Sequence, residues 1–194
     1  MNSQTNQNEK IFFTQEQTID MTKFKPEGLL LDVGGGGEGI IGKIKIDNTV
    51  VIDLSKKELE ETPSGPLKIV MDVTSLQFLD ETFDIVTAFF SFMYIRPDRR
   101  LTALKEIKRV LKQDGKIFIW DASVPPRNEN EKPFYAIKLK ISLPGGEIVQ
   151  TGYGINWETH QQSFEEFIHN CETIGLKLLE KKDNAHWFTF EIQK

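Results

Sequence analysis

A run of apolar residues that ends near a carboxylate and passes directly into a glycine-rich turn constrains the fold of this chain most strongly. Residues 29–33 read Leu-Leu-Leu-Asp-Val, and all residues from Gly34 to Gly39 except Glu38 are glycine. The apolar run is typical of a buried strand. Glycines allow positive φ angles and let a ligand approach the main chain closely. The segment therefore predicts a strand that leads into a ligand-binding turn.

The charge of this turn bears on the kind of ligand. Gly34, Gly36 and Gly39 fit the G-x-G-x-x-G spacing of dinucleotide-binding folds. However, Asp32 and Glu38 flank the place where a dinucleotide would lay its pyrophosphate. Like charges repel, so the turn favours a cationic nucleoside such as S-adenosylmethionine, which carries a sulfonium and an ammonium group. An NAD(P)-binding oxidoreductase on the same fold is the alternative.

A second acidic residue follows one βαβ repeat later. The β-branched run 49–52 ends at Asp53. A carboxylate at the end of the second strand is placed to accept hydrogen bonds from both ribose hydroxyls of a nucleoside. The alternative is a cap for the helix expected over residues 55–61, a role that Ser55 could fill itself.

From this point the chain resembles the class I S-adenosylmethionine-dependent methyltransferases, in the form of a small stand-alone domain. The resemblance covers roughly residues 27–125 and continues through the segments 69–73, 83–95 and 104–120. It implies S-adenosylmethionine as cofactor and S-adenosylhomocysteine as product. The positions that it implies for cofactor binding are Asp32, Gly34, Gly35, Gly36, Asp53, Leu54, Asp72, Val73, Ala88 and Phe89.

Two departures from the family pattern limit the resemblance. The usual third glycine position of the loop holds Glu38, and the glycine falls one residue later. No Asn- or Asp-Pro-Pro-aromatic motif follows Ala88. Enzymes that methylate amino groups of nucleic acids are therefore disfavoured.

The order of elements predicts an α/β fold. Apolar runs near 29–33, 49–53, 68–71, 85–88 and 116–121 are separated by helical stretches. This alternation predicts a Rossmann-like three-layer sandwich around a mostly parallel seven-stranded sheet, covered on both faces. At the C-terminal end, Ser163 to Glu166 forms a capping box for a helix that stops at Gly175. Residues 176–181 and 187–192 then predict an antiparallel pair at the sheet edge.

An inserted β-hairpin is expected between the fifth strand and that helix. Residues 137–143 alternate between apolar and polar, and Pro144-Gly145-Gly146 turns the chain back. We expect the insertion, residues 133–160, to cover the substrate and to contact the acceptor through Tyr153 and Trp157, while leaving the cofactor to the glycine turn. The alternatives are an extension of the sheet and a subunit contact.

Composition sets the remaining expectations. The 194 residues fit a single domain, with residues 1–10 as a flexible tail and residues 10–23 folding over the ligand mouth. The net charge of −5 argues against a nucleic-acid partner. One cysteine, Cys171, allows neither a disulfide nor a cysteine metal site, which indicates the cytoplasm. No membrane partner is expected, and the protein would be a monomer or a homodimer. The basic residues of helix 104–112 are interpreted as a solvated face.

Methyl transfer is an in-line displacement, so the protein chiefly has to align the reacting groups and exclude water. The aromatic residues after the fourth strand, Phe89, Phe90, Phe92 and Tyr94, could form a wall near the sulfonium or pack in the core. A hydroxyl acceptor would need a base, and the candidates are His160, Tyr94 and Asp121. The sequence thus predicts methyl transfer to a small-molecule acceptor. A non-catalytic S-adenosylmethionine-binding domain is a further alternative.

Overall fold

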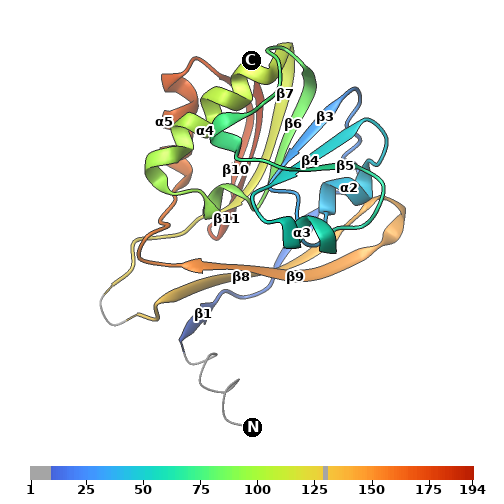
Figure 1. Cartoon of the computed structure of the whole chain (residues 1–194). Helices are drawn as coiled ribbons and strands as arrows, with labels where there is room; N and C mark the ends of the chain where they lie inside the picture. The colour runs from blue at the N-terminus through green and yellow to red at the C-terminus, as the bar shows by residue number, and fades with distance from the viewer. Residues whose placement is uncertain (1–9, 129–130) are drawn as a thin grey trace.

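The computed structural model describes residues 10–128 and 131–194 and contains two β-sheets (Figure 1). Most of the expected tail, residues 1–9, lies outside the described ranges. The larger sheet has seven strands in the order β10-β11-β7-β6-β3-β4-β5. These strands are β3 (Leu30–Val33), β4 (Thr49–Asp53), β5 (Leu67–Val70), β6 (Phe83–Phe89), β7 (Leu111–Ala122), β10 (Lys177–Asp183) and β11 (Trp187–Gln193).

The pairing of these strands confirms the predicted fold class. Strands β5, β4, β3, β6 and β7 are mutually parallel, whereas β11 is antiparallel to both β7 and β10. The central strands are buried on both faces, which requires nearly continuous apolar sequence. In β3, Leu30 packs into the core on one face, and Leu31 and Val33 pack into the core on the other.

Helices cover one face of the large sheet, the face on which Leu31 and Val33 lie. These helices are α4 (Pro97–Val110) and α5 (Phe164–Thr173), with the short 3₁₀ turn η1 (Val73–Ser75). Helix α4 buries Ala103, Leu104 and Ile107, whose spacing of three to four residues forms one apolar stripe. The predicted capping box is confirmed, because the Ser163 hydroxyl accepts a hydrogen bond of 3.1 Å from the Glu166 amide.

The second sheet confirms the predicted hairpin and places the N-terminal segment beside it. Strands β8 (Phe134–Ser142) and β9 (Ile148–Asn156) are antiparallel and are joined through η3 (Pro144–Gly146). Strands β1 (Ile11–Phe13) and β2 (Gln17–Asp20) pair in parallel with the other edge of β8. The expectation that this segment folds over the ligand mouth is wrong, because Ile19 and Met21 are buried in the core.

This four-stranded sheet covers the second face of the large sheet, together with the short helix α2 (Ile40–Ile44). Ile137, Leu139 and Ile141 of β8 belong to the same buried cluster as Leu30 and Ile85 of the large sheet. Figure 1 shows the β8–β9 hairpin passing below α2 and α3 (Lys56–Glu61). The three predicted layers are therefore present, but one of them is mainly a β-sheet rather than helices.

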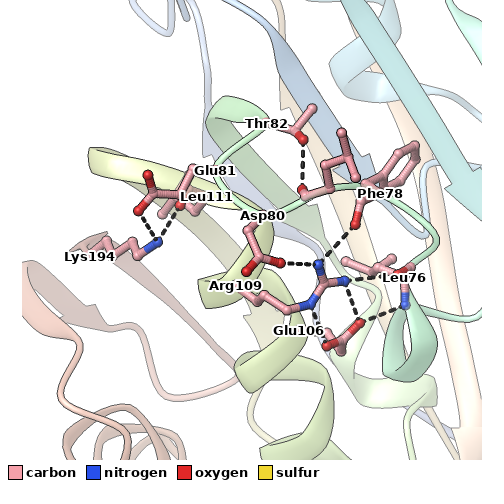
Figure 2. Close-up of polar contacts among 10 residues, drawn as sticks. Leu76, Phe78, Asp80, Glu81, Thr82, Glu106, Arg109, Leu111 and Lys194 are labelled. Carbon is pink, nitrogen blue, oxygen red and sulfur yellow. Dashed lines mark hydrogen bonds and ion pairs between the residues drawn. The ribbon is translucent and has the colours of Figure 1, made fainter.

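The sequence suggested that the basic residues of α4 form a solvated face, but most of them bind other parts of the chain. Figure 2 shows Arg109 donating to Asp80, to both oxygens of Glu106 and to the carbonyls of Leu76 and Phe78, at 2.6–2.9 Å. These bonds raise the pKa of Arg109 above its ordinary value, chiefly through Glu106 and Asp80. The guanidinium thus fastens the loop before β6 to α4.

Neighbouring lysines act in the same way. Lys108 donates to the Ile174 carbonyl at 2.5 Å, and Lys112 pairs with Asp84 at 2.7 Å. Lys105, by contrast, is exposed. Among the described helices none has the length and apolar character needed to cross a bilayer.

Replacing Arg109 tests the structural role of this network. Arg109→Met leaves two carboxylates and two carbonyls without their donor, so we expect the free energy of unfolding to fall by about 1–3 kcal/mol. Chemical denaturation followed by circular dichroism measures this change. Lys105→Met, on the same helix, is the matched control and should stay within about 0.5 kcal/mol. Equal stability of the two variants would contradict the proposed role of Arg109.

Candidate functional site

A cavity of about 560 Å³ lies at the carboxyl ends of the central strands. Its size is typical of a small-molecule site, and its place is the one where open α/β sheets bind ligands. It is lined by the residues that follow β5, β4, β3 and β6, and by Gly152 and Tyr153 of β9. The cavity therefore extends across four strands of the large sheet to the hairpin.

The glycine turn folds around the carboxylate of Asp32. Gly34 and Gly37 have φ angles of +68° and +67°, which favour glycine. A Cβ atom on Gly35 would lie 2.1 Å from Oδ2 of Asp32. The turn needs glycine here because the chain passes too close to the carboxylate for any side chain.

The amide groups of Gly34 to Gly37 already have partners within the chain. The amides of Gly34 and Gly35 donate to the Ile52 carbonyl at 2.8 and 3.3 Å. Gly36 donates to Oδ2 of Asp53 at 3.3 Å, and the Gly37 amide donates to the carbonyl of Glu58 at 2.9 Å. A pyrophosphate-binding turn instead directs its amides at the ligand. These four amides are thus not directed at a ligand anion.

Asp32 is buried at the end of the central strand. Burial disfavours its ionised form and raises its pKa to about 7, against the opposing effect of a hydrogen bond from the Thr87 hydroxyl. That bond measures 2.8 Å. The nearby charge of Asp53 raises the pKa further. A cation bound next to Asp32 would stabilise the ionised carboxylate.

Asp53 does not serve as the cap of α3. The Ser55 hydroxyl accepts the hydrogen bond from the Glu58 amide at 3.2 Å, which is the capping contact. Asp53 instead accepts from the Ser55 amide at 2.8 Å, and its carboxylate faces the cavity beside Leu54. The carboxylate therefore stands where the ribose was expected.

Asp72 lies at the far end of the cavity, after β5. Burial acts to raise its pKa, but hydrogen bonds from Thr74 and from Arg99 hold the pKa below its ordinary value. The ion pair with Arg99 measures 3.0 Å. Asp72 is therefore ionised at neutral pH.

Nine of the ten predicted cofactor residues line this one cavity, and they come from all four strand ends. They are Asp32, Gly34, Gly35, Gly36, Asp53, Leu54, Asp72, Val73 and Phe89. Ala88 is completely buried in β6 and does not line it.

An aromatic wall closes the cavity at the β6 end. Phe90 has a φ angle of +49°, a strained conformation for a bulky residue that often marks a functional site. Its ring stacks on Tyr153 of β9, with centroids 5.5 Å apart and planes at 17°. Phe89 and Tyr94 also line the cavity. Phe92 points away and packs against Phe167 in the core.

The three candidate bases occupy different environments. Tyr94 lines the cavity, but partial burial raises its pKa to about 12, so the phenol keeps its proton at neutral pH. His160 does not line the cavity. Burial and the charge of Arg100 lower its pKa, and its Nδ1 lies 2.8 Å from the Thr159 hydroxyl.

Asp121 has a structural position. It is completely buried and accepts hydrogen bonds from the amides of Phe92 and Met93 at 2.7 and 3.2 Å, and from Gln162 at 3.0 Å. Burial raises its pKa to about 6. Asp121 does not line the cavity but holds the turn η2 (Phe92–Tyr94), which carries Tyr94.

The hairpin contacts the cofactor loop directly, which the sequence did not reveal. Glu38 of the glycine turn accepts hydrogen bonds from the hydroxyls of Thr151 and Tyr153 on β9, the latter at 3.2 Å. The hairpin thus borders the same cavity as the glycine turn. Trp157, expected at the acceptor, is instead buried, and its indole donates to the Pro125 carbonyl at 2.7 Å.

Several residues that the sequence did not single out for this role also line the cavity. They are Ile40, Ile41, Glu58, Met71, Thr74, Ser91, Arg96 and Arg99. Only their proximity to the predicted strand ends could have indicated them. In the described part of the chain, no group of three or more His, Cys, Asp or Glu side chains is arranged to hold a metal ion.

Comparisons with known proteins agree with this geometry. Residues 31–119 match the family model described as a methyltransferase domain. The chain is 27% identical over 173 residues to des-methyl DIF-1 methyltransferase A of Dictyostelium discoideum, covering 80% of this chain and 45% of that protein. The chain spans about half the length of these curated relatives, 45% of this one and 46% of an uncharacterised protein of Methanocaldococcus jannaschii.

Solved structures share the fold. An S-adenosylmethionine-dependent methyltransferase from Mesorhizobium loti aligns with a TM-score of 0.62 at 12% identity, covering 88% of this chain and 94% of that one. The [4+2]-cyclase SpnF aligns with a TM-score of 0.62 at 15% identity, covering 89% and 76%. At these identities the similarity shows the fold and not the reaction.

The matching family model spans the strands that build the cavity, and the structural neighbours share their arrangement. Residues 31–119 thus match a methyltransferase-domain model, and the chain shares its fold with S-adenosylmethionine-dependent methyltransferases.

Proposed function

We propose that this protein transfers the methyl group of S-adenosylmethionine to a small-molecule acceptor. The observation that carries the proposal is the acidic glycine turn. The amides of Gly34 to Gly37 are paired within the chain, and the acidic residues Asp32, Glu38 and Asp53 line the cavity. Such a surface attracts a sulfonium and an ammonium and repels a pyrophosphate. This distinguishes the proposal from an NAD(P)-dependent oxidoreductase.

The lining residues fit the cofactor along the cavity. Asp53 would accept hydrogen bonds from the ribose hydroxyls, and Asp72 would lie by the adenine amino group. Leu54 and Val73 also line the cavity and would border the adenine. Asp32 would face the ammonium group of the amino-acid end. When bound, the cofactor supplies the electrophilic methyl carbon.

The chain's own contribution to the reaction is alignment and exclusion of water. Phe89, Phe90 and Tyr153 form an apolar wall beside the expected methyl position. The Tyr94 phenol, which stays protonated, can donate a hydrogen bond but cannot act as a base at neutral pH. The proposal therefore assigns no general base to His160, Tyr94 or Asp121.

We further propose a cytoplasmic protein, a monomer or a homodimer, that acts without a nucleic-acid partner. The net charge of −5 and the single cysteine support this setting.

Ligand choice is the first test. S-adenosylhomocysteine should raise the melting temperature, because a ligand that binds only the folded state stabilises it, while NAD and NADP should not. Thermal scanning fluorimetry at a matched ligand concentration measures the shifts. Comparable stabilisation by NAD would overturn the cofactor assignment. Turnover of labelled methyl donor over a metabolite panel separates an enzyme from a non-catalytic binding domain.

A substitution at the second strand tests the ribose contact. Asp53→Ala removes a charge-assisted acceptor and should weaken binding of S-adenosylhomocysteine by about 10- to 150-fold. Isothermal titration calorimetry measures the dissociation constant. Asp47→Ala, at the exposed opposite end of β4, is the matched control and should bind normally. If the two variants bind equally well, the ribose is held elsewhere.

Asp32 should make cofactor binding depend on pH. Its pKa of about 7 without ligand means that the cation-binding carboxylate is lost as the pH falls through this value. We therefore expect affinity for S-adenosylhomocysteine to decline from pH 8 to pH 6. The Asp32→Asn variant should bind S-adenosylhomocysteine weakly, and its affinity should not change over this pH range.

The free protein should show the opposite trend. Because folding raises the pKa of Asp32, protonation of this group stabilises the folded state at low pH. This contribution to the free energy of unfolding is lost as the pH rises from about 4, the pKa in the unfolded chain, through about 7, the pKa in the folded protein. Denaturation across this range, compared with Asp32→Asn, isolates the contribution. A wild-type affinity that does not change with pH would contradict the role of Asp32.

A further inference from the structure

Two basic side chains line the cavity, Arg96 and Arg99. Each is already paired, Arg99 with Asp72 at 3.0 Å and Arg96 with Asp98 at 3.1 Å. Phe89, Phe90, Tyr153 and the loop residue Glu38 line the cavity beside β6 and the hairpin.

Glu38 is the one carboxylate that joins these aromatic residues to the glycine turn. Both of its hydrogen-bond donors, the hydroxyls of Thr151 and Tyr153, are neutral. Within the described ranges no Lys, Arg or His forms an ion pair with it. Burial and the charge of Glu38 raise the pKa of Tyr153, so the phenol remains a donor. A negative charge without a cationic partner therefore borders the aromatic wall formed by Phe90 and Tyr153.

The chemistry of methyl transfer makes this charge selective. An amine attacks as a neutral molecule: its nitrogen lone pair forms the C–N bond, the C–S bond breaks with its electron pair left on sulfur, and the positive charge moves to nitrogen. A hydroxyl must lose its proton to become an oxyanion, which the neighbouring carboxylates of Asp32 and Glu38 disfavour. Acceptors that carry carboxylate or phosphate are repelled from the outset.

From this arrangement we infer that the acceptor is an amine on an apolar or aromatic body, bound against Phe90 and Tyr153, with Glu38 facing its nitrogen. The stacked rings offer apolar area and an aromatic face to a cationic group. The bound ammonium loses one proton to solvent before the attack, and the N-methylammonium product leaves with the positive charge that methyl transfer places on its nitrogen. This inference rests on the proposed methyltransferase function.

Binding to the cofactor-loaded protein tests the inference without knowledge of the natural acceptor. The full chain is saturated with S-adenosylhomocysteine and titrated by calorimetry with matched sets: benzylamine, benzyl alcohol and benzoate, and the corresponding 2-naphthyl compounds. We expect each amine to bind at least about tenfold more tightly than its alcohol, and the carboxylates more weakly still.

Variants assign this preference to the residues named. Glu38→Gln should abolish the preference for amine over alcohol, and Tyr153→Phe, which keeps the carboxylate and the ring, should retain it. Tyr153→Ala should weaken the binding of all the aromatic compounds at least about tenfold. Glu147→Gln is the matched control, because Glu147 pairs with Lys43 at the hairpin tip and does not line the cavity.

The inference is overturned if alcohols or carboxylates bind as tightly as amines, or if Glu38→Gln keeps the preference. It is also overturned if no amine binds at about 10 mM to protein that binds S-adenosylhomocysteine. In each of these cases the proposed function stands. Failure of S-adenosylhomocysteine itself to bind would instead refute the proposed function.

Discussion

The burial of the Asp32 carboxylate at the end of the central strand is the constraint on which the site depends. A buried carboxylate is costly unless it is hydrogen-bonded or paired with a cation. Here the Thr87 hydroxyl supplies one hydrogen bond, and the glycine turn passes so close to Asp32 that a Cβ on Gly35 would collide with it. The remaining cost appears as a raised pKa, which a bound cation would relieve. The buried Asp32 carboxylate thus favours a cationic ligand such as the one proposed.

The second sheet gives this site its outer wall. The β8–β9 hairpin is held in place by its apolar residues, which share a core with the large sheet, and it reaches the glycine turn through Glu38. The same contact brings the ring of Tyr153 onto Phe90, whose backbone is strained. The glycine turn and the hairpin therefore line the same cavity.

Much of the fold could be predicted from the sequence because local patterns specify it. Strands buried on both faces need continuous apolar runs, and the β3 and β4 segments show them. The helix after Ser163 begins with a capping box, and the hairpin turns at Pro144 to Gly146. The acidic strand ends were predictable for a related reason. Parallel strands bring their carboxyl ends to the same edge, so Asp32, Asp53 and Asp72 had to lie near one cavity.

What a side chain contacts across the fold could not be predicted in this way. Asp121 and Trp157 have residue types that suit catalysis and binding, yet their partners, the Phe92 amide and the Pro125 carbonyl, lie 29 and 32 residues away along the chain. The sequence indicated a solvated Arg109, whereas in the structure the loop before β6 packs onto its guanidinium. The sequence alone determined the order of strands and helices and the acidic glycine turn, because these depend on neighbouring residues. Only the tertiary structure decided which layer covers the second face and which side chains reach the cavity, because these depend on long-range packing.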